Sequence, residues 1–217
     1  MKQSQIENVL VIGDIHEPFS LDEYLPFCKS VYKKYKCNRV VFIGDAIDGH
    51  AVSYHETDVN GLSATEELDQ AIKRLAKWHK MFPNADFITG NHDALIERKL
   101  NTAGLPKKWM RPLKEVLDLP TWNFHTKLEL NGVLYIHGQG PTARTAALRV
   151  GKSTVQGHRH TEGYVWFNRT DQFGMQVGTG IDKESYAFAY ARHFPDPVLS
   201  CGVVLNNGSL PLFIPMR

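Results

Sequence analysis

The fold of this chain is constrained most by five short apolar runs, each of which ends in a cluster of polar residues. The five are VLVIG before DIH, VVFIG before DAID, DFITG before NHD, VLYI before HG, and STVQG before HRH. Short runs rich in valine and isoleucine and punctuated by glycine are typical of buried strands. The sequence therefore predicts five strands whose carboxyl ends carry Asp, Asn or His.

Helical patterns separate the first three runs. Apolar side chains from Leu21 to Tyr35 repeat at the spacing of one helical face. Further along, Ser63 and Glu66 have the spacing of a capping box, and an apolar stripe continues from there to Phe82. Strands that alternate with helices are typical of a parallel sheet, so we expect a βαβαβ arrangement in the first half of the chain.

The second half is richer in strands. Asn131-Gly132 and Asn207-Gly208 each stand between apolar segments, and both pairs are typical of tight hairpin turns. The sequence holds no internal repeat, low-complexity tract or long linker rich in Pro, Gly or Ser. We therefore expect one α/β domain over residues 1–217.

Composition narrows the class of protein. With 42% hydrophobic and 22% charged residues the chain is ordinary for a soluble globular protein, and a net charge of +2 argues neither for nor against nucleic acid. No apolar run approaches the ~20 residues that span a bilayer, and the first residues lack the apolar stretch of a signal peptide. The three cysteines form no CxxC pair, which favours a reducing compartment. We expect a cytoplasmic protein with no membrane partner.

The polar residues at the five strand ends form a candidate metal site. They are Asp14, His16, Asp45, Asp48, Asn91, His92, Asp93, His137, His158 and His160. Ligands of α/β folds bind at the carboxyl ends of strands, and imidazole nitrogens and carboxylate oxygens suit borderline divalent metals. No cysteine takes part, which argues against a structural zinc site. One ion needs about four to six donors, so the set is large enough for two ions that share a carboxylate.

Each motif taken alone has a simpler interpretation. An Asp-x-His pair is common by chance, Gly-Asp after a strand is usually a turn, and Asn after glycine can end a strand in a left-handed conformation. Random turns would not repeatedly choose His, Asp and Asn in place of Ser, Gly and Lys. The repetition after five strands therefore favours a functional site.

Together, the motifs GDIH, GDAID, GNHD, HG and GHRH resemble the five-motif signature of the calcineurin-like metallophosphoesterases. They extend from Asp14 to His160, about two thirds of the chain. The resemblance implies a four-layer α/β/β/α sandwich of two mixed sheets, with the site at the sheet ends. It also implies that the chain is a metal-dependent phosphoric ester hydrolase.

The resemblance assigns ligands to two divalent ions. The first ion would be held by Asp14, His16, Asp45 and His160. The second ion would be held by Asp45, Asn91, His137 and His158, with Asp45 bridging the two. Ions ~3.5–4 Å apart would lower the pKa of bound water to about 7, and the resulting hydroxide would attack phosphorus. Manganese is the expected metal, and iron, zinc and nickel tolerate the same donors.

Further roles follow from the same resemblance. His92 would be the general acid for the leaving oxygen, and Asp93 would orient and stabilise its imidazole. Asp48 would support a metal-ligating histidine. The phosphoprotein-phosphatase branch has Asp-Arg-Gly where this chain has Asp48-Gly49-His50, which weakens the case for a protein phosphatase. Asn91 and His50 are the candidate substrate contacts, and a surface position in the loop is the alternative for His50.

The stretch from Arg98 to Lys114 bears on the substrate. Its sequence, RKLNTAGLPKKWMRPLK, carries six basic residues and no acidic one. Basic side chains with an interleaved aromatic residue suit a nucleic-acid strand. The simpler alternative is a solvated helix pair that packs on the core through Trp109, Leu113, Val116 and Leu117.

Several functions stay open at this stage. We expect a phosphodiesterase, with DNA or RNA as the candidate substrate. A cyclic-nucleotide phosphodiesterase and a phosphomonoesterase are alternatives, and a catalytically silent interaction scaffold is the rival from another class. Residues outside the motifs are expected to be surface or packing residues, namely His55, His79, His125, His193 and the segment 186–190.

Overall fold

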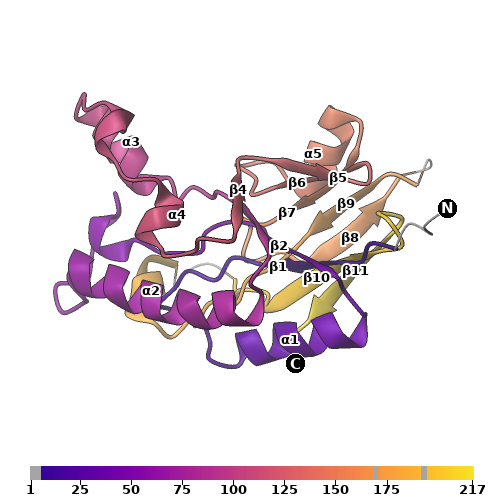
Figure 1. Cartoon of the computed structure of the whole chain (residues 1–217), viewed down its shortest axis with the longest axis horizontal. Helices are drawn as coiled ribbons and strands as arrows, with labels where there is room; N and C mark the ends of the chain where they lie inside the picture. Colours follow the sequence, from indigo (N-terminus) through magenta and orange to yellow (C-terminus); the bar gives the residue numbers. More distant parts are fainter. Residues whose placement is uncertain (1–5, 169–170, 192–194) are drawn as a thin grey trace.

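Two mixed β-sheets stack face to face in the computed structural model, which describes residues 6–168, 171–191 and 195–217 (Figure 1). The first sheet has the strand order β11-β10-β1-β2-β3-β4. Its parallel strands are β1 (Val9–Ile12), β2 (Arg39–Phe42), β3 (Asp86–Ile88) and β4 (Asn123–His125). The antiparallel strands are β10 (Ser200–Leu205) and β11 (Leu210–Pro215).

The second sheet has the strand order β5-β6-β7-β9-β8. Its three parallel strands are β6 (Val133–Ile136), β7 (Ser153–Gln156) and β9 (Phe173–Gln176). The antiparallel edges are β5 (Leu128–Leu130) and β8 (Tyr164–Phe167). The five strands that the sequence predicts are therefore confirmed as β1, β2, β3, β6 and β7, and they divide between the two sheets.

Helices form the outer layers. The outer face of the first sheet packs on α1 (Tyr24–Lys34) and α2 (Ala64–Met81), and α5 (Ala143–Val150) packs on β7 and β9 of the second sheet (Figure 1). Between β3 and β4 the chain forms α3 (Leu95–Thr102), the 3-10 turn η2 (Lys107–Trp109) and α4 (Leu113–Val116). Two further 3-10 turns are η1 (His50–Val52) and η3 (Tyr186–Ala191). This architecture is the expected four-layer α/β/β/α sandwich.

The central position of β1 explains why its sequence is apolar at every residue. Val9 and Val11 belong to the buried cluster between the two sheets, whereas Leu10 and Ile12 belong to the cluster under α1 and α2. Alternate side chains of a strand point to opposite faces, so a strand that is covered on both faces needs no polar alternation.

Local signals in the sequence set the ends of several elements. Ser63 caps α2, because its hydroxyl accepts from the Glu66 amide while the Glu66 carboxylate accepts from the Ser63 amide. The turn between β5 and β6 uses Asn131 and Gly132, with φ of +49° and +75°. Both residues of a tight hairpin turn need positive φ, which asparagine and glycine tolerate best.

The basic stretch from Arg98 to Lys114 packs only in part. Leu117 is buried at 1% exposure and Leu113 packs against the core, as the helix-pair interpretation requires. Trp109, in contrast, is 75% exposed. That interpretation is therefore wrong for Trp109, because the indole has no place in the core.

Among the described residues, no helix has both the length and the apolar character needed to cross a membrane.

Leu75 of α2 provides a test of the packing under the first sheet. Its side chain is fully buried, so Leu75→Ala should lower the free energy of unfolding by about 2–5 kcal/mol through lost burial and a residual cavity. Val59→Ala is the control, because Val59 is 95% exposed and should change stability by less than about 0.5 kcal/mol. Urea unfolding measures both, and equal effects in the two variants would contradict the packing described.

Candidate metal centre

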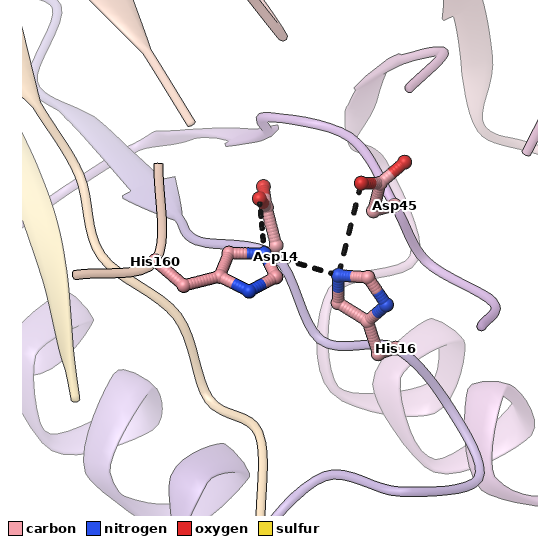
Figure 2. Close-up of side chains that lie close together, drawn as sticks. All are labelled: Asp14, His16, Asp45 and His160. Carbon is pink, nitrogen blue, oxygen red and sulfur yellow. Dashed lines mark hydrogen bonds and ion pairs between the residues drawn. The ribbon is translucent and has the colours of Figure 1, made fainter. Parts of the chain in front are cut away.

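All seven predicted metal ligands meet at the carboxyl ends of the central strands. Each lies in the loop after β1, β2, β3, β6 or β7, so both sheets contribute to the site. Ligand atoms of Asp14, His16, Asp45 and His160 lie within 4.8 Å of one another (Figure 2). Ligand atoms of Asp45, His137 and His158 form a second group with the same spacing. Asp45 is common to both groups.

The first group has the geometry of side chains that face one cation. The Nε2 atoms of His16 and His160 are 3.2 Å apart, and His160 Nε2 is 3.1 Å from Asp14 Oδ2. The distance from His16 Nε2 to Asp45 Oδ2 is 3.7 Å. Two nitrogens that each lie about 2.0–2.1 Å from a shared ion are themselves roughly 3 Å apart, which agrees with this spacing.

The tautomer of His16 leaves a lone pair for that cation. Its Nδ1 is 2.7 Å from Asp48 Oδ1, and a carboxylate oxygen can only accept, so Nδ1 carries the proton. The opposite nitrogen, Nε2, is then free to bind a metal. A carboxylate that orients a ligating histidine in this way is the role expected for Asp48. Burial lowers the pKa of His16, which favours the neutral imidazole that a metal requires.

The second group is arranged around His137. Its Nε2 lies 3.1 Å from Asp45 Oδ2, 2.9 Å from Asn91 Oδ1 and 3.2 Å from His158 Nδ1. Its Nδ1 donates to the backbone carbonyl of Ile43 at 3.1 Å, so Nε2 is again the atom that faces the site. Asn91 therefore supplies a neutral oxygen to the group, as the sequence predicts.

An unsatisfied carboxylate oxygen indicates that the site is built for a cation. Asp14 is fully buried, and its Oδ2 accepts from the His158 amide at 2.7 Å. Its Oδ1 is also buried and has no hydrogen-bond partner among the described residues. Leaving such an oxygen unpaired is costly, and a bound cation would remove that cost. The donor set and this oxygen together fit divalent metal ions.

The backbone bends sharply to aim the ligands. His16, Asp45 and His158 have φ of +47°, +46° and +70°, in the left-handed region that residues with a Cβ rarely adopt. Such strain clusters at functional sites, where the surrounding fold holds it in place. The glycines before two of the polar clusters also have a steric reason: a Cβ on Gly90 would collide with Asp45 Oδ1, and one on Gly157 with Asp14 Oδ1.

His92 lies beside the metal groups without belonging to the two that share Asp45. Its Nδ1 is 2.6 Å from the backbone oxygen of Asp48, so Nδ1 donates and Nε2 is left for a substrate. Burial lowers the pKa of His92, but the charges of Asp45 and Asp48 outweigh burial and the net shift is upward. A raised pKa favours the protonated imidazole that a general acid needs.

The structure corrects one part of the role expected for Asp93, the orientation of His92, whereas the charge of Asp93 does help to raise the pKa of that imidazole. Its carboxylate accepts from the amides of Gly90 at 2.7 Å and Ala46 at 3.0 Å, and it makes no hydrogen bond to His92. Burial and the nearby charge of Asp45 raise the pKa of Asp93 to about 7. Asp93 therefore ties the loop after β2 to the loop after β3, and Asp48 orients His92 instead.

The structure also corrects the role expected for His50. Its side chain is buried, and Nε2 accepts from the Asp58 amide at 3.0 Å. The ring packs edge-on against Tyr186, with centroids 5.3 Å apart. His50 therefore supports the loop after β2 and is not a phosphate contact.

A cleft of about 780 Å³ opens over the predicted metal ligands. From the predicted set it is lined by Asp45, Asn91, His92, His158 and His160. It is also lined by His55 and Phe188, which were expected to be surface or packing residues, and by Arg159 and Lys183, which the sequence analysis missed. Arg159 stands inside the GHRH motif, which is a signal that could have been used, whereas nothing local distinguishes the other three.

The histidines outside the motifs have different surroundings. His79 bonds Thr121 and His125 bonds Asp86, in agreement with the expected surface or packing roles. His193 lies outside the described residues. Within 186–190, Phe188 is buried and packs edge-on against His16 with centroids 5.7 Å apart, so this segment packs but also borders the cleft.

The fold and the two candidate ligand groups agree with those of a metallophosphoesterase. The chain belongs to the calcineurin-like phosphoesterase family, whose sequence model matches residues 7–200. Among curated proteins, none matches this sequence.

Several solved structures are similar to this chain at low sequence identity. Vacuolar protein sorting 29 from Cryptosporidium parvum is 16% identical, with a TM-score of 0.55 over 98% of this chain and 92% of that chain. YfcE, a phosphoesterase from E. coli, is 14% identical, with a TM-score of 0.46 over 97% of this chain and 100% of that chain. The nuclease MPE from Pseudomonas putida is 14% identical, with a TM-score of 0.38 over 95% of this chain and 87% of that chain.

Proton release on metal binding tests the second ligand group. Burial lowers the pKa of His137, but the charges of Asp45 and Asp14 raise it further, to about 10. The metal-free imidazole is therefore protonated at neutral pH, and a metal must displace that proton. We expect Mn²⁺ binding at pH 7 to release about one proton from this side chain, and affinity to increase as the pH rises.

Titration calorimetry in buffers of different ionisation enthalpy counts the protons released. His137→Gln should remove this release, because glutamine has no proton to lose at that pH. The same number of protons in the variant and in the unchanged protein would show that His137 is not their source.

Proposed function

We propose that this chain is a metal-dependent phosphodiesterase with two divalent ions. The observation that carries the proposal is the shared position of Asp45, whose Oδ2 faces His137 Nε2 at 3.1 Å and His16 Nε2 at 3.7 Å. One carboxylate oxygen between two groups of metal donors suits a bridged pair of ions. Manganese as the native metal and a cytoplasmic location stay predictions.

The two ions would be held by Asp14, His16, Asp45, Asn91, His137, His158 and His160. When bound, they would supply Lewis acidity toward the phosphoryl oxygens and a nucleophilic water at neutral pH. Only Asp14 and Asp45 carry negative charge in this set, because Asn91 and the neutral imidazoles carry none. The protein therefore neutralises only part of the charge of two divalent ions, and the site keeps a net positive charge that attracts a phosphate.

His92 would give its Nε2 proton to the leaving oxygen. The Nδ1 proton stays bonded to the Asp48 carbonyl throughout, so the imidazole returns to the neutral tautomer in a fixed orientation. The amide of His92 donates to Asp45 Oδ1 at 2.8 Å, which fixes the position of the acid relative to the metal groups. Proton donation of this kind contributes typically 10²–10⁴-fold to the rate.

Among the described residues, Arg159 and Lys183 are the Arg and Lys side chains that line the cleft, and their contacts favour a diester over a monoester. Arg159 donates to Glu162 and to the Gly140 carbonyl, and Lys183 lies 3.1 Å from both carboxylate oxygens of Asp196. Neither side chain is placed to grip the extra negative charge of a phosphomonoester. A phosphodiester carries a single charge and needs less compensation.

The experiment that tests this function is hydrolysis of bis-p-nitrophenyl phosphate with added Mn²⁺, followed by a panel of cyclic nucleotides, DNA, RNA and phosphomonoesters. We expect turnover of diesters, and preference for a monoester would overturn the diester assignment.

One structure with this fold bears the name of a vacuolar protein sorting protein, so an interaction scaffold is the alternative to exclude. A protein that binds Mn²⁺ but hydrolyses nothing would favour the scaffold.

Removal of His92 should slow the reaction in a way that depends on the leaving group. His92→Ala should reduce hydrolysis of a diester with an alkoxide leaving group by about 10²–10⁴-fold, because that oxygen needs a proton. The p-nitrophenyl diester should be affected less, and the bound metal should be unchanged. His79→Ala, whose imidazole bonds Thr121 at the surface, is the matched control. An unchanged rate for the alkoxide diester would exclude His92 as the acid.

Removal of Asp45 should abolish metal and activity together. Asp45→Ala deletes the only carboxylate that both ligand groups share, so we expect it to lose most of the bound metal. Asp69→Ala, an exposed carboxylate on α2, should keep both metal and activity. Metal per chain is measured by mass spectrometry after gel filtration, with thermal unfolding as the check on folding. Retention of two ions per chain by Asp45→Ala would be incompatible with a bridging role.

A further inference from the structure

The segment 95–110 forms an arm beside the metal centre, which we name the basic arm. It consists of α3, a turn and η2, and α3 stands away from the sheets and from α1 and α2 (Figure 1). With 8 residues, α3 is about 12 Å long at 1.5 Å per residue. The arm therefore carries side chains outward from the rim of the cleft.

The basic arm has an excess of positive charge. It contains Arg98, Lys99, Lys107 and Lys108 but only one acidic residue, Glu97. Glu97 pairs with Lys107 at 2.7 Å, and Lys108 has no ion-pair partner within the part of the chain that the structure describes. The surface is thus suited to an anionic partner with more than one charge.

Two exposed aromatic rings accompany these charges. Trp109, at the end of the arm, is 75% exposed, and Tyr54, after η1, is 57% exposed. The Tyr54 ring has Lys99 Nζ 4.5 Å from its centroid and the Arg98 guanidinium at 5.6 Å. Exposed aromatic rings among cations are the combination that binds single-stranded nucleic acid, since bases stack on the rings and phosphates face the cations.

The basic arm is continuous with the metal centre. The guanidinium of Arg98 donates to the backbone oxygen of Asn91 at 3.1 Å, and Asn91 belongs to the second ligand group. On the other side, Lys99 Nζ is 3.4 Å from the Ser53 carbonyl, two residues before the cleft-lining His55. A strand that lies along the arm would therefore reach the rim of the cleft.

We propose that the basic arm binds a single nucleic-acid strand, stacks a base on Trp109 and leads the strand to the metal centre. This inference rests on the proposed phosphodiesterase function and names its substrate class as a polynucleotide. A single strand fits better than a duplex, because a duplex hides the faces of its bases from an indole ring. An acidic protein would satisfy the charges, but it offers no planar bases for Trp109.

The test is the binding of a fluorescein-labelled 20-nucleotide oligothymidylate, measured by anisotropy. The full chain is used with Mn²⁺ and His92→Ala, so that cleavage is slowed during the measurement. Trp109→Ala should weaken binding by about 5- to 100-fold, the effect expected for one lost stacked base. Its unfolding temperature should not change, since the indole is 75% exposed.

Phe167→Ala is the matched control for the aromatic ring. Phe167 is also exposed, at 50%, but it belongs to β8, which lies on the opposite side of the view from α3 in Figure 1. Its truncation should leave oligothymidylate binding unchanged. Equal losses in Trp109→Ala and Phe167→Ala, or no loss in either, would overturn the proposal.

The salt dependence of binding gives an independent readout for the cations. Loss of one phosphate contact to a single strand should reduce the slope of log K against log salt concentration by about 0.7, and we expect this for Lys108→Ala. An unchanged slope would exclude Lys108 from the contact. Binding of poly-glutamate with the same sensitivity to Trp109→Ala would assign the arm to acidic proteins and overturn the inference.

The outcomes for the arm and for the enzyme are separable. Hydrolysis of bis-p-nitrophenyl phosphate without any oligothymidylate binding would overturn the basic-arm proposal and leave the phosphodiesterase intact. Binding of oligothymidylate by a protein that hydrolyses no diester would overturn the phosphodiesterase function and leave strand binding by the basic arm intact.

Discussion

The structure depends on two buried carboxylates, Asp14 and Asp45, that lie among the imidazole nitrogens of the candidate metal centre. Asp14 and Asp45 are almost completely buried, and Asp14 Oδ1 has no hydrogen-bond partner within the described residues. Such an arrangement is costly for a protein alone, because desolvated charges and lone pairs repel one another. Divalent cations at this point would turn the cost into a gain. Bound cations would in this way stabilise the loops around the candidate metal centre as well as supply the proposed chemistry.

The sandwich supplies the rigidity that such a centre needs. Asp14 follows β1 in the first sheet and His137 follows β6 in the second, so the packing of the two sheets sets the distance between ligand groups. The left-handed conformations of His16, Asp45 and His158 are held by this framework. Asp93 adds to it by accepting the amides of two neighbouring loops. The positions of the predicted metal ligands therefore depend in part on buried polar contacts, and the residues that make these contacts need not take part in the reaction.

The sequence predicted those parts that depend on local patterns. Buried strands, the Ser63 cap and the Asn131-Gly132 turn follow from periodicity and backbone preferences, and the ligands follow from polar residues at strand ends. Division of the strands into two sheets, and the place of β10 beside β1, depend on pairings between distant segments that no local pattern encodes. His50 and the expected contact between Asp93 and His92 were misassigned because a motif gives residue types but not hydrogen-bond partners. Trp109 was open to two interpretations, and its exposure excludes the one in which the indole packs on the core.

The central claim is that two cations bind on either side of Asp45, and anomalous scattering tests it most directly. Crystals soaked in manganese should give two peaks in an anomalous difference map recorded near the manganese absorption edge. One peak should lie among Asp14, His16, Asp45 and His160, and the other among Asp45, Asn91, His137 and His158. A map with no peak at these residues, or with a single peak that Asp45 does not contact, would contradict the account.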